Sequence, residues 1–194
     1  SKMLNERQEG KNIGLAYCQE RGFTAESIDK FHLGYSPDQW DALTKAALNA
    51  GFQEEFLISS GLTIQKGEKL FDRFKGRVMF PIHSMSGRVM GFGGRILKQD
   101  KQSAKYVNSP ESEVYQKSKV LYGLYQAKQH IAKESNCYLV EGYTDVIQMH
   151  QAGIQNVVSS SGTALTSDQV RLVRRLTNSI TLLFDGDAAG LRAA

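Results

Sequence analysis

The sequence predicts an α/β protein in which a mixed α+β subdomain is followed by a sheet of parallel strands. One observation behind this prediction is a switch, near residue 62, from short helical patterns to β-rich runs. Another is the alternation, after residue 133, of apolar runs with helical patterns of about ten residues, which is typical of βαβ units. We therefore expect two domains, residues 1–133 and residues 134–194.

The first sixty residues predict three short helices that capping residues and glycines delimit. GLAYCQERGF ends its helix at Gly22, and TAESIDKFHLG opens with a Thr24 cap and closes at Gly34. SPDQWDALTKAALNAG predicts a third helix from Ser36-Pro37 to Gly51.

The middle of the chain predicts extended structure. GRVMFPIHSMSGRVMGFGGRIL consists of two β-rich runs joined by Ser-Met-Ser-Gly, which predicts a hairpin, and AKYVNSP predicts a further short strand before Pro110. The glycines of GFGG, residues 91–94, leave two interpretations open. They are typical of a bulged or twisted strand, and also of a close approach of the backbone to nucleic acid.

The last sixty residues predict three strands and two helices in alternation. NCYLVEG, NVVSSSG and SITLLFD are the strands, and TDVIQMHQAG and TSDQVRLVRRLT are the helices between them. Such units form a parallel sheet that is buried on both faces. We expect Arg171, Arg174 and Arg175 of the second helix to be surface residues opposite its apolar face.

Composition describes an ordinary globular protein. Of the 194 residues, 41% are hydrophobic and 23% are charged. No apolar run approaches the roughly 18 residues of a membrane span, and no signal peptide is visible, so we expect a cytoplasmic protein without membrane contact. Cys18 and Cys137 then fit free thiols. The sequence has no Cys-x-x-Cys and its four histidines are scattered, so we expect no zinc site.

Positive charge is concentrated in the middle of the chain. Residues 66–119 carry 12 Lys or Arg and 5 Asp or Glu, a balance of +7, whereas the balance is −3 before them and zero after them. Such a block is typical of a surface that faces a polyanion, although a solvated face of lysines would have the same composition. Arg73, Lys75 and Arg77 alternate, so in a strand they would share one face with Phe74 on the other.

Acidic residues follow two of the predicted strands. Glu141 ends the first strand, and Asp185 and Asp187 end the third, so all three lie at the edge where parallel sheets bind ligands. Three converging carboxylates repel one another unless a cation joins them, and oxygen ligands suit Mg²⁺. Asp145, one helical turn after Glu141, is a further candidate acid. The alternative is that Asp185 and Asp187 only cap a helix.

The segment VEGYTDVIQMHQAGIQNVVSSSGTALT…LLFDGDAAGLRAA resembles the Toprim domain, a Rossmann-like parallel sheet. That domain is shared by DNA primases, type IA and type II topoisomerases, OLD-type nucleases and RecR-like repair proteins. Its Glu-Gly and Asp-x-Asp signatures fall on Glu141 and on Asp185 with Asp187. Upstream, RFKGRVMFPIHSMSGRVMGFGGRIL, KYVNSPES and LYGLYQA resemble the catalytic core of the bacterial replicative primase.

This resemblance implies a metal-dependent nucleotidyltransferase that synthesises short RNA primers on single-stranded DNA at the replication fork. It implies Mg²⁺ or Mn²⁺ as cofactor, NTPs as substrates, a monomer, and a replicative helicase partner bound through regions outside this sequence. Glu141, Asp185 and Asp187 would be the catalytic metal ligands, and Glu141 could also act as a general base. The positions that would hold template or nucleotide are Arg95, Lys105, Tyr106 and Lys117.

The resemblance also implies that a zinc-binding module precedes this sequence and that the rest of the Toprim domain follows Ala194. We therefore expect weak metal binding and little or no primer synthesis by these 194 residues alone. Two rival interpretations remain open: a fragment of a Toprim nuclease or topoisomerase, and a noncatalytic single-strand-binding module. Finally, we expect the following aromatic residues to lie in the core rather than on a binding surface: Trp40, Phe52 and Phe56.

Overall fold

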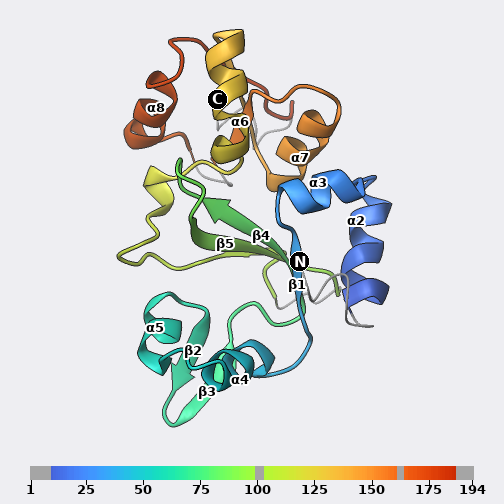
Figure 1. Cartoon of the computed structure of the whole chain (residues 1–194), viewed down its shortest axis with the longest axis vertical. Helices are drawn as coiled ribbons and strands as arrows, with labels where there is room; N and C mark the ends of the chain where they lie inside the picture. The colour runs from blue at the N-terminus through green and yellow to red at the C-terminus, as the bar shows by residue number, and fades with distance from the viewer. Residues whose placement is uncertain (1–9, 99–102, 161–163, 187–194) are drawn as a thin grey trace. The chain divides into compact units, whose positions relative to one another are not determined.

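The computed structural model describes residues 10–98, 103–160 and 164–186, and the chain divides into two compact units. The first unit contains Ser1–Arg21, His32–Pro81 and Gly91–Tyr115, and the second contains Gly22–Phe31, Ile82–Met90 and Gln116–Ala194. Each unit is therefore built from several separate stretches of the chain. Figure 1 shows the elements coloured by residue number. A domain boundary at residue 133 stays a prediction. Within the described ranges, no helix is long and apolar enough to cross a bilayer.

The first unit is mixed α+β, as expected. Its sheet has the strand order β1-β4-β5-β6, and β2 and β3 form a separate antiparallel hairpin. Its elements are η1 (Gly10–Leu15), α2 (Ala16–Glu20), β1 (Gly34–Ser36), α4 (Ala42–Asn49), α5 (Glu54–Ser59), β2 (Thr63–Lys66), β3 (Lys69–Asp72), β4 (Arg77–His83), β5 (Val89–Ile96) and β6 (Tyr106–Asn108). The end of β4 and the start of β5 belong to a segment of the second unit.

The predicted hairpin of two β-rich runs is confirmed by β4 and β5, which are neighbours in the sheet. Gly91 and Gly94 of β5 are required by packing. A Cβ at Gly91 would lie 2.7 Å from the Tyr115 ring, and one at Gly94 would lie 2.5 Å from the Phe74 ring. These buried rings therefore account for two glycines of GFGG, which favours the structural interpretation of that stretch.

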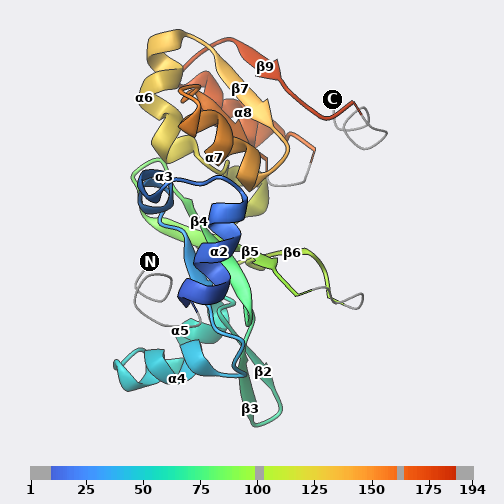
Figure 2. The same cartoon turned by 90° about the vertical axis from the view of Figure 1, so that its right-hand side faces the viewer.

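The second unit contains the predicted parallel sheet, with β7 (Cys137–Val140) between β8 (Val157–Ser159) and β9 (Ile180–Leu182). Its helices are α3 (Ala25–Lys30), the 3₁₀ turn η2 (Lys117–Lys119), α6 (Leu124–Glu134), α7 (Tyr143–Gln151) and α8 (Ser167–Arg174) (Figure 2). Side chains of α6, α8 and the sheet form one buried cluster that includes Ile131, Leu139, Val158 and Val173. The alternation of strands and helices in the sequence is thus confirmed.

The capping signals predicted the start of one helix and the end of another: α3 begins after Thr24, and α4 ends close to Gly51. Thr24 caps α3 by accepting a hydrogen bond from Ser27 N–H at 3.2 Å, as expected. The helix then ends at Lys30 rather than near Gly34, because Gly34 already belongs to β1 and pairs with β4. The helix expected from Ser36-Pro37 to Gly51 covers only α4. The hairpin of β2 and β3 and the helix α5 were not predicted.

The expectation that three aromatic residues lie in the core is wrong. The exposed fractions are 56% for Trp40, 64% for Phe52 and 61% for Phe56. All three belong to the segment that carries α4 and α5, two short helices whose packing partner is a two-stranded hairpin. Such a small assembly has too little interior to cover every large apolar side chain that its sequence contains.

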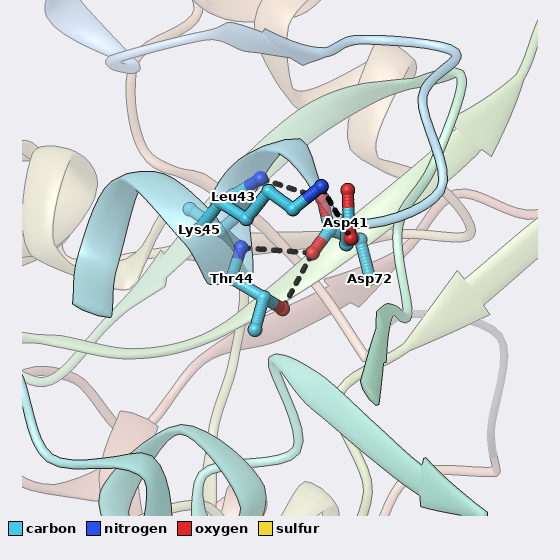
Figure 3. A network of polar contacts seen from close by, with 5 residues as sticks. All are labelled: Asp41, Leu43, Thr44, Lys45 and Asp72. Carbon is cyan, nitrogen blue, oxygen red and sulfur yellow. Dashed lines mark hydrogen bonds and ion pairs between the residues drawn. The ribbon is translucent and has the colours of Figure 1, made fainter. Parts of the chain in front are cut away.

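A buried carboxylate joins α4 to the hairpin of β2 and β3 (Figure 3). Asp72, at the end of β3, is 4% exposed and accepts hydrogen bonds from the N–H groups of Leu43 and Thr44 at 2.7 and 2.9 Å. It also accepts the Thr44 hydroxyl at 2.7 Å. Asp72 thus satisfies the start of a helix that lies about thirty residues earlier in the chain, where the helix has no side-chain cap of its own.

Candidate active site and nucleic-acid interface

Glu141 lies directly after the central strand of the parallel sheet. The hydroxyl of Ser159, at the end of β8, donates to the Glu141 carbonyl oxygen at 2.7 Å and so ties two strand ends together. The Glu141 carboxylate Oε1 accepts the backbone N–H of Asp185 at 2.9 Å. The first and third predicted strands are therefore neighbours, and their acidic residues lie side by side at one sheet edge.

The side chain of Asp185 is exposed beside Glu141, and Asp187 lies outside the described residues. Of the predicted three acids, Glu141 and Asp185 are therefore neighbours through a backbone N–H and a carboxylate oxygen. No group of three His, Cys, Asp or Glu side chains gathers within residues 10–98, 103–160 and 164–186. The donors that are present are hard oxygen ligands, which fit a divalent cation such as Mg²⁺.

Asp145 has a structural role that the sequence did not indicate. Its Oδ2 accepts the N–H of Gly142 at 2.9 Å, so this carboxylate closes the first turn of α7 immediately after Glu141. An acid at the start of a helix is also favoured by the helix dipole. Asp145 therefore fixes the backbone that follows Glu141, and a further role as a metal ligand stays a prediction.

Arg95 and Tyr106 form the centre of a cationic and aromatic cluster in the first unit. They are directly paired across β5 and β6, and Arg95 Nη1 donates to the Tyr106 hydroxyl at 2.9 Å. The Arg95 guanidinium carbon lies 5.4 Å from the centre of the Tyr106 ring and 4.8 Å from that of Tyr17. Arg21 lies 5.7 Å from the same Tyr17 ring. Of these four residues, the sequence pattern indicated Arg95 and Tyr106 but not Tyr17 and Arg21.

Lys105 precedes Tyr106 and its side chain is exposed. Its carbonyl oxygen accepts the N–H of Ile96 at 3.0 Å, so the pairing of β5 with β6 continues past the strand end. Lys117 lies in η2 of the second unit, where its carbonyl oxygen accepts from Gln169 Nε2 at 3.1 Å. Lys105 thus adds charge next to Arg95 and Tyr106, whereas Lys117 belongs to a separate compact unit.

The expectation that Arg73, Lys75 and Arg77 share one strand face is wrong, because residues 73–76 form a turn and β4 begins at Arg77. Arg77 is 7% exposed and donates through Nη1 to the carbonyl oxygens of Gly94 and Ala104 at 3.2 and 3.0 Å. Burial lowers the pKa of its guanidinium. Arg77 is therefore a structural cation that joins the chain after β5 to the sheet.

Arg73 and Lys75 each have a partner within the first unit. Arg73 Nε donates to the Gly61 carbonyl oxygen at 2.6 Å, and burial lowers the pKa of its guanidinium. Lys75 Nζ lies 3.6 Å from Asp38 Oδ1 and 5.3 Å from the centre of the Trp40 ring. Of the two, Lys75 is placed on an exposed surface with an aromatic neighbour.

The exposed Trp40 ring provides a second aromatic surface. It lies 5.0 Å from the Phe71 ring, centre to centre, and its backbone carbonyl accepts the N–H of Asp72 at 2.8 Å. With Lys75 beside it, Trp40 combines the stacking face and the cation that single-stranded nucleic acid requires. The sequence signal that could have indicated its exposure is its position in a polar segment, SPDQWDA, rather than in a periodic apolar face.

Two family models match this chain. A model described as the N-terminal domain of the DNA primase catalytic core matches residues 1–128, and a model of the Toprim domain matches residues 135–194. Among curated proteins, a DNA primase from Halalkalibacterium halodurans is 45% identical over 188 residues, covering 96% of this chain and 31% of the relative. A DNA primase from Deinococcus radiodurans is 46% identical over 182 residues, covering 92% and 32%. This chain thus spans about a third of their length.

Solved structures give the same match. The RNA polymerase domain of Mycobacterium tuberculosis primase DnaG has a TM-score of 0.89 at 40% identity, covering 97% of this chain and 63% of that one. The Aquifex aeolicus primase, solved with its zinc-binding and RNA polymerase domains, has a TM-score of 0.89 at 38% identity, covering 99% and 46%. A DnaG primase catalytic domain bound to single-stranded DNA has a TM-score of 0.88 at 39% identity, covering 100% and 59%.

Proposed function

Because this chain belongs to the DnaG-type bacterial DNA primase family, we propose that it forms part of the catalytic core of a primer-synthesising enzyme. The parent protein would join NTPs into short RNA on a single-stranded DNA template. The observation that carries the proposal is the hydrogen bond from Asp185 N–H to the Glu141 carboxylate at 2.9 Å, which joins both Toprim signatures at one sheet edge.

Glu141 and Asp185 would hold the divalent cation, Mg²⁺ or Mn²⁺, with Asp187 as the third expected ligand. When bound, the ion would neutralise charge on the transferring α-phosphate and favour deprotonation of the attacking 3′-hydroxyl. The chain contributes the fixed positions of the carboxylates. The central strand β7, the Ser159 tether and the Asp145 cap hold the Glu141 backbone from both sides.

The proposed nucleic-acid-binding surface consists of the cluster of Arg95, Lys105 and Tyr106, together with Trp40 and Lys75. Phosphates are attracted by the cations, and unpaired bases stack on the aromatic rings. The related primase catalytic domain solved with single-stranded DNA supports this assignment of ligand class. A replicative helicase, NTPs and a monomeric state belong to the proposal for the whole parent protein.

Template binding gives the first test. We expect Arg95→Ala to weaken binding of a labelled oligothymidylate about tenfold and to flatten the dependence of log affinity on log salt by about 0.7, because one phosphate contact is lost. Trp40→Ala should weaken binding by a similar factor and leave the salt slope unchanged, since stacking releases no counterions. Fluorescence anisotropy over a salt series measures both quantities.

The matched control is Arg171→Ala in α8. This arginine is exposed and forms an ion pair with Asp168 at 2.7 Å, so its removal should change neither affinity nor slope. A larger loss of affinity for Arg171→Ala than for Arg95→Ala would show that the proposed interface has been assigned to the wrong surface.

The rival functions are separated by the product that the parent protein makes. A primase yields RNA that depends on both NTPs and template. A Toprim nuclease or topoisomerase changes the DNA strands without NTPs, and a binding module yields no product. Within the described residues no observation favours either rival over primer synthesis.

A further inference from the structure

Tyr17 is a buried aromatic residue of the short helix α2, in which Cys18 is also buried. It is 7% exposed, whereas its neighbours Gln19 and Glu20 in α2 are exposed. Its ring lies within 6 Å of two guanidinium groups, those of Arg21 and Arg95, at 5.7 and 4.8 Å. These distances are within the range of cation–π attraction. The contact with Arg95 therefore joins helix α2 to strand β5, and Arg21 adds a second cation at the end of α2.

Arg95 is held in this cluster without a carboxylate partner. Its Nη1 donates to the Tyr106 hydroxyl, and its Nε is buried without a hydrogen-bond partner. None of the ion pairs found in the described part of the chain includes it. Two aromatic rings thus orient the guanidinium while its positive charge remains available for an anion.

Burial raises the pKa of the Tyr17 hydroxyl to about 12. Like an unperturbed tyrosine, the phenol is protonated at neutral pH, so it takes no charge away from the neighbouring arginines. An aromatic ring is suited to this position because its negative face attracts a guanidinium without neutralising it. A carboxylate would orient Arg95 equally well, but it would also compete with a phosphate for the same donors.

We propose that Tyr17 is a positioning residue, whose ring holds the Arg95 guanidinium in the orientation that binds a phosphate of the nucleic-acid ligand. The proposal rests on the proposed function, because it takes Arg95 as a phosphate contact. Fixing a long side chain before binding lowers the entropy cost of forming the complex. Tyr17 therefore contributes to affinity without touching the nucleic acid.

The test compares Tyr17→Phe with Tyr17→Leu in binding of labelled oligothymidylate over a salt series. Tyr17→Phe keeps the ring and should bind as the unmodified chain does. Tyr17→Leu should weaken binding about tenfold and flatten the salt slope, although it removes no charge. A residue that only stabilises α2 would not change the slope.

The same substitutions in the Arg95→Ala background complete a double-mutant cycle. Tyr17→Leu should have no further effect there, since the cation that it positions is gone. An equal loss in both backgrounds, or no loss in the presence of Arg95, would overturn the role of Tyr17. If Arg95→Ala itself leaves binding unchanged, the proposed nucleic-acid interface fails, and that result is distinct from failure of the Tyr17 role.

Because leucine at position 17 could prevent folding, a second variant keeps the shape of the ring. Pentafluorophenylalanine at position 17 retains size and burial but reverses the charge distribution of the ring face, so affinity should fall about tenfold relative to Tyr17→Phe. The matched control is the same replacement at Tyr115, which is 1% exposed in the same unit and packs against Gly91. It shows whether a fluorinated ring at a buried position changes the affinity by itself. Equal affinities of Tyr17→Phe and the fluorinated variant would overturn the proposal.

Discussion

Glu141→Gln in the full-length parent protein should reduce primer synthesis about a thousandfold or more. Glutamine has the same shape and can still accept the Asp185 N–H through its side-chain oxygen, so the hydrogen bond at the sheet edge is retained. It lacks the negative charge that a divalent cation needs. Loss of about 4 kcal/mol of transition-state stabilisation corresponds to that factor in rate. Incorporation of labelled NTPs on a single-stranded template measures the effect.

The matched control for Glu141→Gln is Asp168→Asn. Asp168 is an acid of the same unit that forms an exposed ion pair with Arg171 in α8. The Asp168→Asn variant should therefore keep normal primer synthesis. Thermal unfolding of both variants should match that of the unmodified protein. Retention of more than a tenth of the activity by Glu141→Gln would show that this carboxylate is not part of the catalytic centre.

Asp72→Ala should lower the free energy of unfolding by about 3 kcal/mol or more. The substitution leaves the N–H group of the partly buried Leu43 and that of the buried Thr44, at the start of α4, without their acceptor. It also removes the acceptor of the Thr44 hydroxyl, which then keeps only its contact with Thr63 at 2.8 Å. Each buried donor that loses a charged acceptor costs about 1–3 kcal/mol. Urea unfolding followed by circular dichroism measures the change.

Figure 3 also shows the control for Asp72. Lys45 forms an exposed ion pair with Asp41 at 3.0 Å, four residues apart on the same helix. Pairs of this kind contribute about 0.3–0.5 kcal/mol, so Lys45→Ala should change stability little. If Asp72→Ala and Lys45→Ala lowered the free energy of unfolding equally, the hydrogen bonds between Asp72 and the start of α4 would not be a main stabilising contact of the first unit.

Local patterns predicted the alternating strands and helices of the second unit, but not its helix α6. The alternation of apolar runs and helices after residue 133 predicted β7, α7, β8, α8 and β9. The structure adds a capping box at Thr166, which begins α8. The neighbouring positions of Glu141 and Asp185 followed from the rule that parallel strands end at one edge. These features are set by residues close in sequence, together with one general rule of topology.

The first unit was predicted less well, because its key contacts join residues that are distant in sequence. Nothing within SPDQWDAL shows that Asp72 caps α4 from 28 residues away. The spacing of Arg73, Lys75 and Arg77 suits a strand, but Gly76 adopts φ of +67° and turns the chain before β4 begins. Residue type alone also placed Trp40 in the core, whereas its exposure depends on how little interior the segment around it provides.

The most direct test of the central claim, that Glu141 and Asp185 form a divalent-cation site, is Mn²⁺ relaxation enhancement of solvent water on this chain. The unmodified chain should enhance relaxation with weak, saturable binding, and Mg²⁺ should compete. Glu141→Gln combined with Asp185→Asn should abolish the enhancement, while Asp168→Asn should leave it unchanged. Equal enhancement in the unmodified chain and in the double variant would contradict the site and the metal-dependent mechanism that rests on it.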